Sequence, residues 1–285
     1  MPKTASITIT VDGSKSGQSI LVADGGSGGF GLRDLPLSRK PIMIGKMFKT
    51  DSGLDLSYTL SAGSPFEVVG SGAETALAFK KGATGVSKDD FNANGELEVT
   101  ITASQAGNGS YHAAQSVSRT FKIKKPSKSV FYDERKADPR FDDVKNDALS
   151  RIAAKKGLSG EKALALFNSD NYDSDGDGVS NLIERAFGGD SLGNDSRANR
   201  PAPVKANDGK EYLSFNRYSS DYQTDMGIEY IVERSTDRRT WSTSGVELVG
   251  SATDLGGGME RVVYRTTSAT SAGNTQFIRV RVKAK

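Results

Sequence analysis

The chain has 285 residues, of which 35% are hydrophobic and 26% charged, and its formal net charge is +3. This length and apolar content predict two or three domains, each with a core of its own. The 38 basic and 35 acidic side chains are too evenly balanced for a dedicated nucleic-acid-binding protein. The absence of cysteine excludes disulfides and thiolate metal sites, and it fits an exported protein as well as a cytosolic one.

The first residues alternate between apolar and polar and predict a half-buried strand at residues 4–11. No signal peptide is visible before this strand, and no apolar run approaches the roughly 20 residues that span a bilayer. If the protein is exported, we therefore expect Met1 to be the start of a fragment of a longer chain.

The glycine-rich stretch at 25–31 contains a G-x-G-x-x-G pattern, which in a dinucleotide site would open a helix. Here Pro36 and Pro41 follow, and prolines at this spacing prevent such a helix. A flexible loop is therefore the interpretation that we favour.

Residues 41–125 consist of short alternating segments separated by turn signals such as Asn94 and Gly95. This spacing is typical of an immunoglobulin-like (Ig-like) β-sandwich. After a short strand at 19–22, the predicted strands are 42–49, 54–60, 66–69, 76–79, 97–103 and 117–124.

Residues 97–114 and 118–123 resemble the closing strands of bacterial Ig-like repeats, and residues 56–65 are similar to an earlier part of them. Residues 64–95 depart from the usual spacing, which leaves the strand order there open. The resemblance implies a tandem domain of a large secreted or surface-attached protein. His112, the one histidine, lies in this segment, where we interpret it as a surface residue and not as part of a nucleophilic triad or a zinc site.

Residues 126–140 contain two prolines and mixed charges and are predicted to be a linker. Apolar residues at helical spacing follow at 141–153, and Gly157 ends that helix. Ser159 can cap a second helix that runs to Phe167. With the segment that follows, these helices form an expected unit at 141–190.

Residues 173–184 match the ligand spacing of an EF-hand calcium loop. Such a loop needs side-chain oxygens at positions 1, 3, 5, 9 and 12, a backbone carbonyl at position 7 and a glycine at position 6. Gly178 is that glycine, and the predicted ligands are Asp173, Asp175, Asp177, Val179 through its carbonyl, Asn181 and Glu184.

The context of the loop supports this interpretation over that of a solvated acidic turn. An apolar stripe begins at Val179, continues to Phe187 and stops at Gly188, as expected for the helix that leaves such a loop. Asp170 and Asn171 precede the loop and could add a ligand oxygen, although ordinary turn residues are the simpler interpretation.

A second linker is predicted at 191–210, followed by a C-terminal β-sandwich at 211–285. Its strands are predicted at 211–217, 228–234, 261–265 and 277–283, and Trp241 is expected to fill its core rather than to stack on a ligand. Arginines alternate with apolar residues on these strands, which indicates a solvated face or a stripe that binds a polyanion. They are Arg217, Arg234, Arg261, Arg265, Arg279 and Arg281.

The order of the calcium-type loop at 173–190 and the segments 212–217, 230–235 and 277–282 resembles the C-terminal region of large exported bacterial proteins. The loop alone is similar to those of dockerins and thrombospondin type 3 repeats. Since a dockerin has two loops and this chain has one, cohesin binding is not carried over. The resemblance implies calcium and an extracellular or cell-surface location.

We therefore expect a mainly β protein with two Ig-like β-sandwiches, at 1–125 and 211–285, joined by a helical EF-hand-like unit. Its expected function is that of a calcium-binding structural or adhesive module in which calcium rigidifies the junction between domains. One alternative is a subunit of a calcium-dependent fibre that associates through exposed edge strands.

A second alternative is a carbohydrate-binding module with an aromatic platform formed by Tyr218, Tyr222, Trp241 and Tyr264. An enzyme is the least favoured class, because Glu229, Glu233 and Glu260 are not brought together by any feature of the sequence.

Overall fold

The computed structural model describes residues 15–22, 35–36, 41–80, 86–195, 199–271 and 275–285. The protein is mainly β, with 35% strand and 21% helix, and it contains several antiparallel sheets. The predicted strand at 4–11 and the glycine-rich stretch at 25–31 lie outside the described residues.

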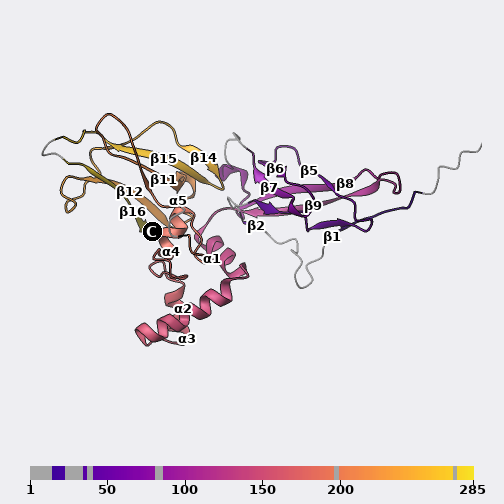
Figure 1. The fold of residues 1–285 in the computed structure, drawn as a ribbon, viewed down its shortest axis with the longest axis horizontal. Coiled ribbons are helices and arrows are strands. Elements are labelled where there is room, and N and C mark those ends of the chain that lie inside the picture. Colours follow the sequence, from indigo (N-terminus) through magenta and orange to yellow (C-terminus); the bar gives the residue numbers. More distant parts are fainter. Residues whose placement is uncertain (1–14, 23–34, 37–40, 81–85, 196–198, 272–274) are drawn as a thin grey trace, which may run out of the picture. The chain divides into compact units, whose positions relative to one another are not determined.

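The chain forms two compact units (Figure 1). The first consists of Met1–Leu35, Lys40–Lys81 and Glu98–Ile123, and the second of Pro36–Arg39, Gly82–Leu97 and Lys124–Lys285. The helices and the C-terminal strands thus belong to one compact unit.

The first unit is built from short antiparallel strands. They are β1 (Ile20–Val22), β2 (Leu35–Pro36), β3 (Ile42–Met43), β4 (Phe48–Thr50), β5 (Ser57–Leu60), β6 (Phe66–Val69), β7 (Ala76–Phe79), β8 (Glu96–Gln105) and β9 (Ala114–Lys124). One sheet has the order β2-β9-β8-β5, a second has the order β3-β7-β6, and β1 pairs with β4. In β8, Val99, Ile101 and Ala103 are buried and alternate with more exposed neighbours, so this sheet has one apolar face.

Five α-helices lie in the second unit. They are α1 (Lys128–Ala137), α2 (Phe141–Lys156), α3 (Gly160–Phe167), α4 (Asn181–Phe187) and the short α5 (Ser220–Gln223). As predicted, α2 ends at Gly157, which has a φ of 65°. Two short 3-10 helices lie at Gly72–Glu74 and Lys88–Asp90.

Helix α1 lies inside residues 126–140, where the sequence indicated a linker. It begins after Ser127, whose hydroxyl accepts a hydrogen bond of 3.2 Å from the N–H of Val130. Pro126 and Pro139 stand outside the helix, where they do not interrupt its hydrogen bonds.

The C-terminal strands form two antiparallel sheets. They are β10 (Ala202–Val204), β11 (Tyr212–Tyr218), β12 (Ile228–Ser235), β13 (Val246–Leu248), β14 (Thr253–Gly256), β15 (Met259–Thr266) and β16 (Phe277–Ala284). One sheet has the order β10-β11-β15-β13 with β14 also paired to β15, and the other is the β12-β16 pair.

Helix α4 is part of the core between these strands. Leu182, Ala186 and Phe187 of α4 belong to the same buried cluster as Phe215 of β11 and Val262 of β15. The position of α4 is therefore fixed by the C-terminal sheets.

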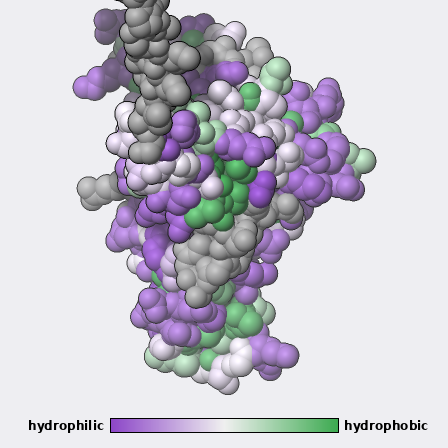
Figure 2. Space-filling view, turned by 90° about the vertical axis from the view of Figure 1, so that its right-hand side faces the viewer, coloured by the Kyte–Doolittle hydropathy of each residue, from purple (hydrophilic) through white to green (hydrophobic). Residues whose placement is uncertain are grey.

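The exposed large apolar residues are dispersed over several elements. Leu21, Met43, Leu164, Val204 and Leu248 are 37–44% exposed, and single exposed apolar side chains of this kind are normal. The face drawn in Figure 2 is mostly hydrophilic, and its apolar areas are small. Among the helices of the described residues, none is long and apolar enough to cross a membrane.

Candidate metal centre

Three carboxylates gather in the loop between α3 and α4. One oxygen each from Asp173, Asp175 and Asp177 lies within 4.8 Å of the other two. The backbone N–H groups of Gly176 and Gly178 donate to the two oxygens of Asp173, at 2.7 and 2.9 Å. Both glycines have positive φ, +84° and +91°, a conformation that glycine adopts at low cost. The EF-hand motif requires a glycine only at the second of these two positions, Gly178.

Glu184 joins the group from the first turn of α4. The residue is 2% exposed, and one of its oxygens lies within 4.8 Å of oxygens from Asp177 and Asp195. Within the described part of the chain, neither Glu184 oxygen has a hydrogen-bond partner, and the buried Oδ2 atoms of Asp175 and Asp177 have none either. Buried carboxylate oxygens without partners are costly, so these four acceptors favour a cation among them.

The electrostatics of the group are those of crowded carboxylates. Burial, followed by the charges of Asp175 and Asp177, raises the pKa of Glu184 to about 9. Burial and the charge of Asp177 raise the pKa of Asp175 to about 6, although the hydrogen bond from the Asp177 backbone opposes this shift. Burial also raises the pKa of Asp195. Without a cation, Glu184 therefore retains at neutral pH a proton that an isolated carboxyl group would already have released.

The donor set determines which ions fit. The five acidic side chains gathered here, Asp173, Asp175, Asp177, Glu184 and Asp195, all offer carboxylate oxygens. Hard cations such as Ca²⁺ and Mg²⁺ prefer oxygen ligands. Ca²⁺ accepts six to eight oxygens in flexible geometry, whereas Mg²⁺ requires a near-ideal octahedron and retains several waters. A group of several carboxylates from one loop and one helix fits Ca²⁺ better.

Ser174, which is fully buried, connects the loop to the surrounding helices. Its hydroxyl accepts a hydrogen bond of 2.6 Å from Arg135 of α1 and lies 3.1 Å from the carbonyl oxygen of Phe167 at the end of α3. Its carbonyl accepts a hydrogen bond of 2.6 Å from Arg151 of α2. The position of the acidic side chains therefore depends on three helices.

Asn181, a predicted ligand, takes part in the same connection. Its amide nitrogen donates to the carbonyls of Phe167 and Ser169, at 3.1 and 2.8 Å, and its Oδ1 accepts from Ser174 at 2.8 Å. Both ends of its side-chain amide are thus engaged in holding the loop to α3. Val179 is the predicted carbonyl ligand. Its own N–H donates a hydrogen bond of 2.8 Å to Oδ1 of Asp177.

Asp170 lies outside the acidic group. Its carboxylate accepts hydrogen bonds from the buried Arg185 at 2.5 and 3.1 Å, from Lys128 at 2.9 Å and from the Tyr132 hydroxyl at 3.0 Å. Although burial raises the pKa of Asp170, the hydrogen bonds from Arg185 and Lys128 hold it well below its usual range. Asp170 is therefore a structural ion-pair partner, and Asn171 is exposed.

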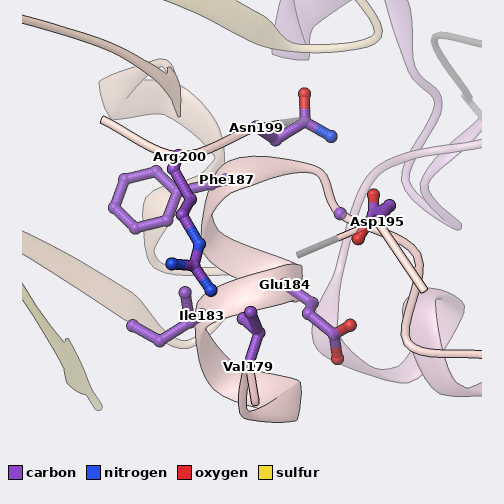
Figure 3. Close-up of a pocket in the computed structure, with 8 residues that line it drawn as sticks. Val179, Ile183, Glu184, Phe187, Asp195, Asn199 and Arg200 are labelled. Carbon is purple, nitrogen blue, oxygen red and sulfur yellow. The ribbon is translucent and has the colours of Figure 1, made fainter. Parts of the chain in front are cut away.

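Asp195 was not predicted as a site residue. It lies beyond α4, in the segment expected to be a linker, and its position in the sequence does not correspond to any ligand position of the EF-hand motif. Figure 3 shows that Asp195 and Glu184 lie on the same side of α4, and both line the same pocket. Only the tertiary fold brings it to Glu184.

The aromatic residues proposed as a carbohydrate platform are placed elsewhere. Tyr222 is buried, and Tyr218 and Tyr264 pack against the core that contains α4. Trp241 is half-buried rather than a core residue, and the guanidinium carbon of Arg279 lies 3.8 Å from its ring centroid. In this arrangement the four rings do not form one exposed surface.

The arginines of the C-terminal strands are engaged in local contacts rather than free for a polyanion. The pairs are Arg217 with Glu260, Arg265 with Glu247, Arg279 and Arg281 with Glu233, Arg261 with Asn216, and Arg234 with the Ser244 carbonyl.

Two of the carboxylates considered for catalysis, Glu233 and Glu260, are thus held in ion pairs, while Glu229 is half-buried on β12 and His112 is exposed.

No protein-family model matches the chain, and no curated protein matches it.

Proposed function

We propose that residues 173–184 form a calcium site of the EF-hand type, in which Asp173, Asp175, Asp177, the Val179 carbonyl and Glu184 bind Ca²⁺. Asn181, which was also predicted as a ligand, is left out of this set because both ends of its amide hold the loop. The observation that carries this proposal is Glu184, which is buried beside other carboxylates and whose two oxygens have no hydrogen-bond partner among the residues that the structure describes. A bound cation would provide the missing partner and would neutralise the repulsion.

We further propose that the protein is a calcium-binding structural or adhesive module of an exported bacterial protein, with Ig-like sandwiches on either side of the calcium unit. The resemblance of residues 97–123 and 173–282 to such proteins supports this proposal. The sheets of the first unit, with one buried face, are compatible with a sandwich.

In this function calcium would rigidify the start of the second unit. The chain passes from β9 directly into α1, and Arg135 of α1 is bonded to Ser174 in the loop. An ion that binds only the folded state adds about 2.7 kcal/mol of stability at a hundredfold excess over Kd. Millimolar calcium outside the cell could supply such an excess.

The test is thermal unfolding, monitored together with light scattering, first in EDTA and then in millimolar Ca²⁺. We expect the midpoint of wild type to rise in calcium and the midpoint of Asp173→Ala to be the same in both media. An unchanged wild-type midpoint would contradict the calcium site. Scattering that increases in calcium and decreases again in EDTA would instead identify the calcium-dependent fibre.

A further inference from the structure

The segment after α4 is held in place by its own contacts. Helix α4 ends at Gly188, which has a φ of 73°, and the Gly188 carbonyl accepts a hydrogen bond of 2.9 Å from the Asn199 side chain. Asp190 forms an ion pair of 3.0 Å with Arg140, which lies just before α2. This turn is therefore anchored independently of any ion.

Within this turn, the Asp195 carboxylate is directed toward the acidic loop. Its Oδ2 accepts a hydrogen bond of 3.1 Å from the N–H of Asp190, and one of its oxygens lies within 4.8 Å of oxygens from both Asp177 and Glu184. Only 2% of Glu184 is exposed, and its two oxygens lack hydrogen-bond partners among the described residues. The unpaired buried side chain and the acidic group are two separate observations, and both indicate a cation between Glu184 and Asp195.

We propose that Asp195 is a calcium ligand supplied from outside the EF-hand-type loop, so that one ion joins the loop to the turn after α4. This inference rests on the proposed calcium site and adds a residue to it. The ion would then be held by residues from both sides of α4, with Asp177 before the helix and Asp195 after it.

Two consequences follow from an additional carboxylate. Calcium affinity increases with the number of charged ligands, so Asp195 strengthens binding. A protein oxygen at this position also replaces a water molecule on the ion. Both effects can be measured.

The experiment compares Asp195→Ala with wild type and with Asp142→Ala. Asp195→Ala removes the carboxylate and leaves no side-chain oxygen that could bind the ion. Asp142→Ala is the matched control, because it removes an exposed carboxylate of α2 that lies outside the acidic group.

Calcium titration calorimetry gives the affinity, and the luminescence lifetime of bound Tb³⁺ in H₂O and D₂O gives the number of waters on the ion. We expect Asp195→Ala to bind calcium about tenfold more weakly and to carry one more water on Tb³⁺. Asp142→Ala should keep the wild-type affinity and water number.

If Asp195→Ala binds like wild type with the same water number, Asp195 is not a ligand and the loop site stands without it. If Asp142→Ala changes the affinity and the water number as much as Asp195→Ala does, the effect is not specific to Asp195 and the inference is also wrong. If wild type itself binds neither ion, the calcium site has failed before the question of Asp195 arises.

Discussion

At the scale of single residues, Glu184 combines two properties that rarely occur together. It is an acidic residue that is buried, and the carboxylates of Asp177 and Asp195 lie next to it. Its place in the first turn of α4 is favourable for negative charge, because the N-terminus of a helix carries a partial positive charge. That effect is worth about 0.3–1 kcal/mol, which is too small to offset several carboxylates.

Replacing Glu184 by glutamine should therefore have opposite effects in the two media. In EDTA, Glu184→Gln removes a buried carboxyl group that stays protonated in the folded state although the unfolded chain would ionise it, and we expect the free energy of unfolding to rise by about 1 kcal/mol, or the midpoint by about 2–4 °C. In calcium, the further stabilisation seen in wild type should disappear. Thermal unfolding in both media checks this, with Glu161→Gln on the exposed face of α3 as the control. A variant that keeps its calcium response would show that Glu184 is not a ligand.

The raised pKa of Glu184 also predicts how stability depends on pH. In the folded protein this pKa is about 9, against a usual value of 4.5. Between these two values the folded state retains a proton that the unfolded state has lost, so stability in EDTA falls as the pH rises through this range. Calcium requires the ionised carboxylate, so its apparent affinity should rise with pH over the same range.

Urea unfolding in EDTA at pH 5, 7 and 9 measures the first effect, and calcium titration at the same pH values measures the second. Glu184→Gln should flatten both dependences. A stability in EDTA that increases from pH 5 to pH 9 would contradict the assignment.

At the scale of elements, the loop is held by Ser174 and the exit helix by the C-terminal core. Ser174 contacts groups of α1, α2 and α3, whereas Phe187 of α4 packs against Phe215 of β11, with ring centroids 6.1 Å apart. The acidic side chains therefore lie between two rigid supports, which preorganises them for an ion.

Ser174→Ala should destabilise this support. The change removes the buried partner of Arg135, whose Nε and Nη1 already lack partners among the described residues. An unpaired buried donor costs about 1–3 kcal/mol or more, and urea unfolding should show a loss of this size. Ser180→Ala is the matched control, since the Ser180 side chain makes no capping bond to α4. Equal losses in the two variants would contradict this role of Ser174.

The elements that could be predicted from sequence are those with a sustained period. The alternation in β8, β12 and β16 and the apolar stripe of α4 each extend over several residues, so a shift of one residue would expose the core face. The short strands β10, β13 and β14 have no such length. Helix α1 was missed because the prolines beside it were interpreted as a sign of a linker.

The candidate site divides in a similar way. Asp173, Asp175, Asp177 and Glu184 follow from spacing, because a single loop fixes their relative positions. The scaffold contacts of Asn181 and the approach of Asp195 depend on α3 and on the turn after α4. No local pattern encodes these tertiary contacts.

At the scale of the whole molecule, the two compact units should respond differently to calcium. The loop belongs to the unit that contains Lys124–Lys285, and α4 lies in the core of its C-terminal strands. Ligand binding stabilises the cooperative unit that contains the site. We therefore expect calcium to act on the strands of that unit as well as on its helices.

Hydrogen exchange with and without calcium measures this directly. Peptides from α1 to α4 and from β11, β12, β15 and β16 should exchange more slowly in calcium, while peptides from residues 41–80 should be unchanged. Protection confined to 173–184 would show that the site is a local loop without influence on the core.

The neighbouring residues Glu184 and Arg185 are both buried on α4, but they obtain their counter-charges from different sources. Arg185 is neutralised within the chain by Asp170, whereas in the proposed site Glu184 would obtain its counter-charge from a bound calcium ion. Depletion of calcium would therefore open the loop while the helix stays attached to its core. Proteases cut where local opening exposes the backbone, so residues 173–180 would be the first point of cleavage. The ion would then determine how long the protein survives, with slow turnover where calcium is abundant and rapid removal where it is scarce.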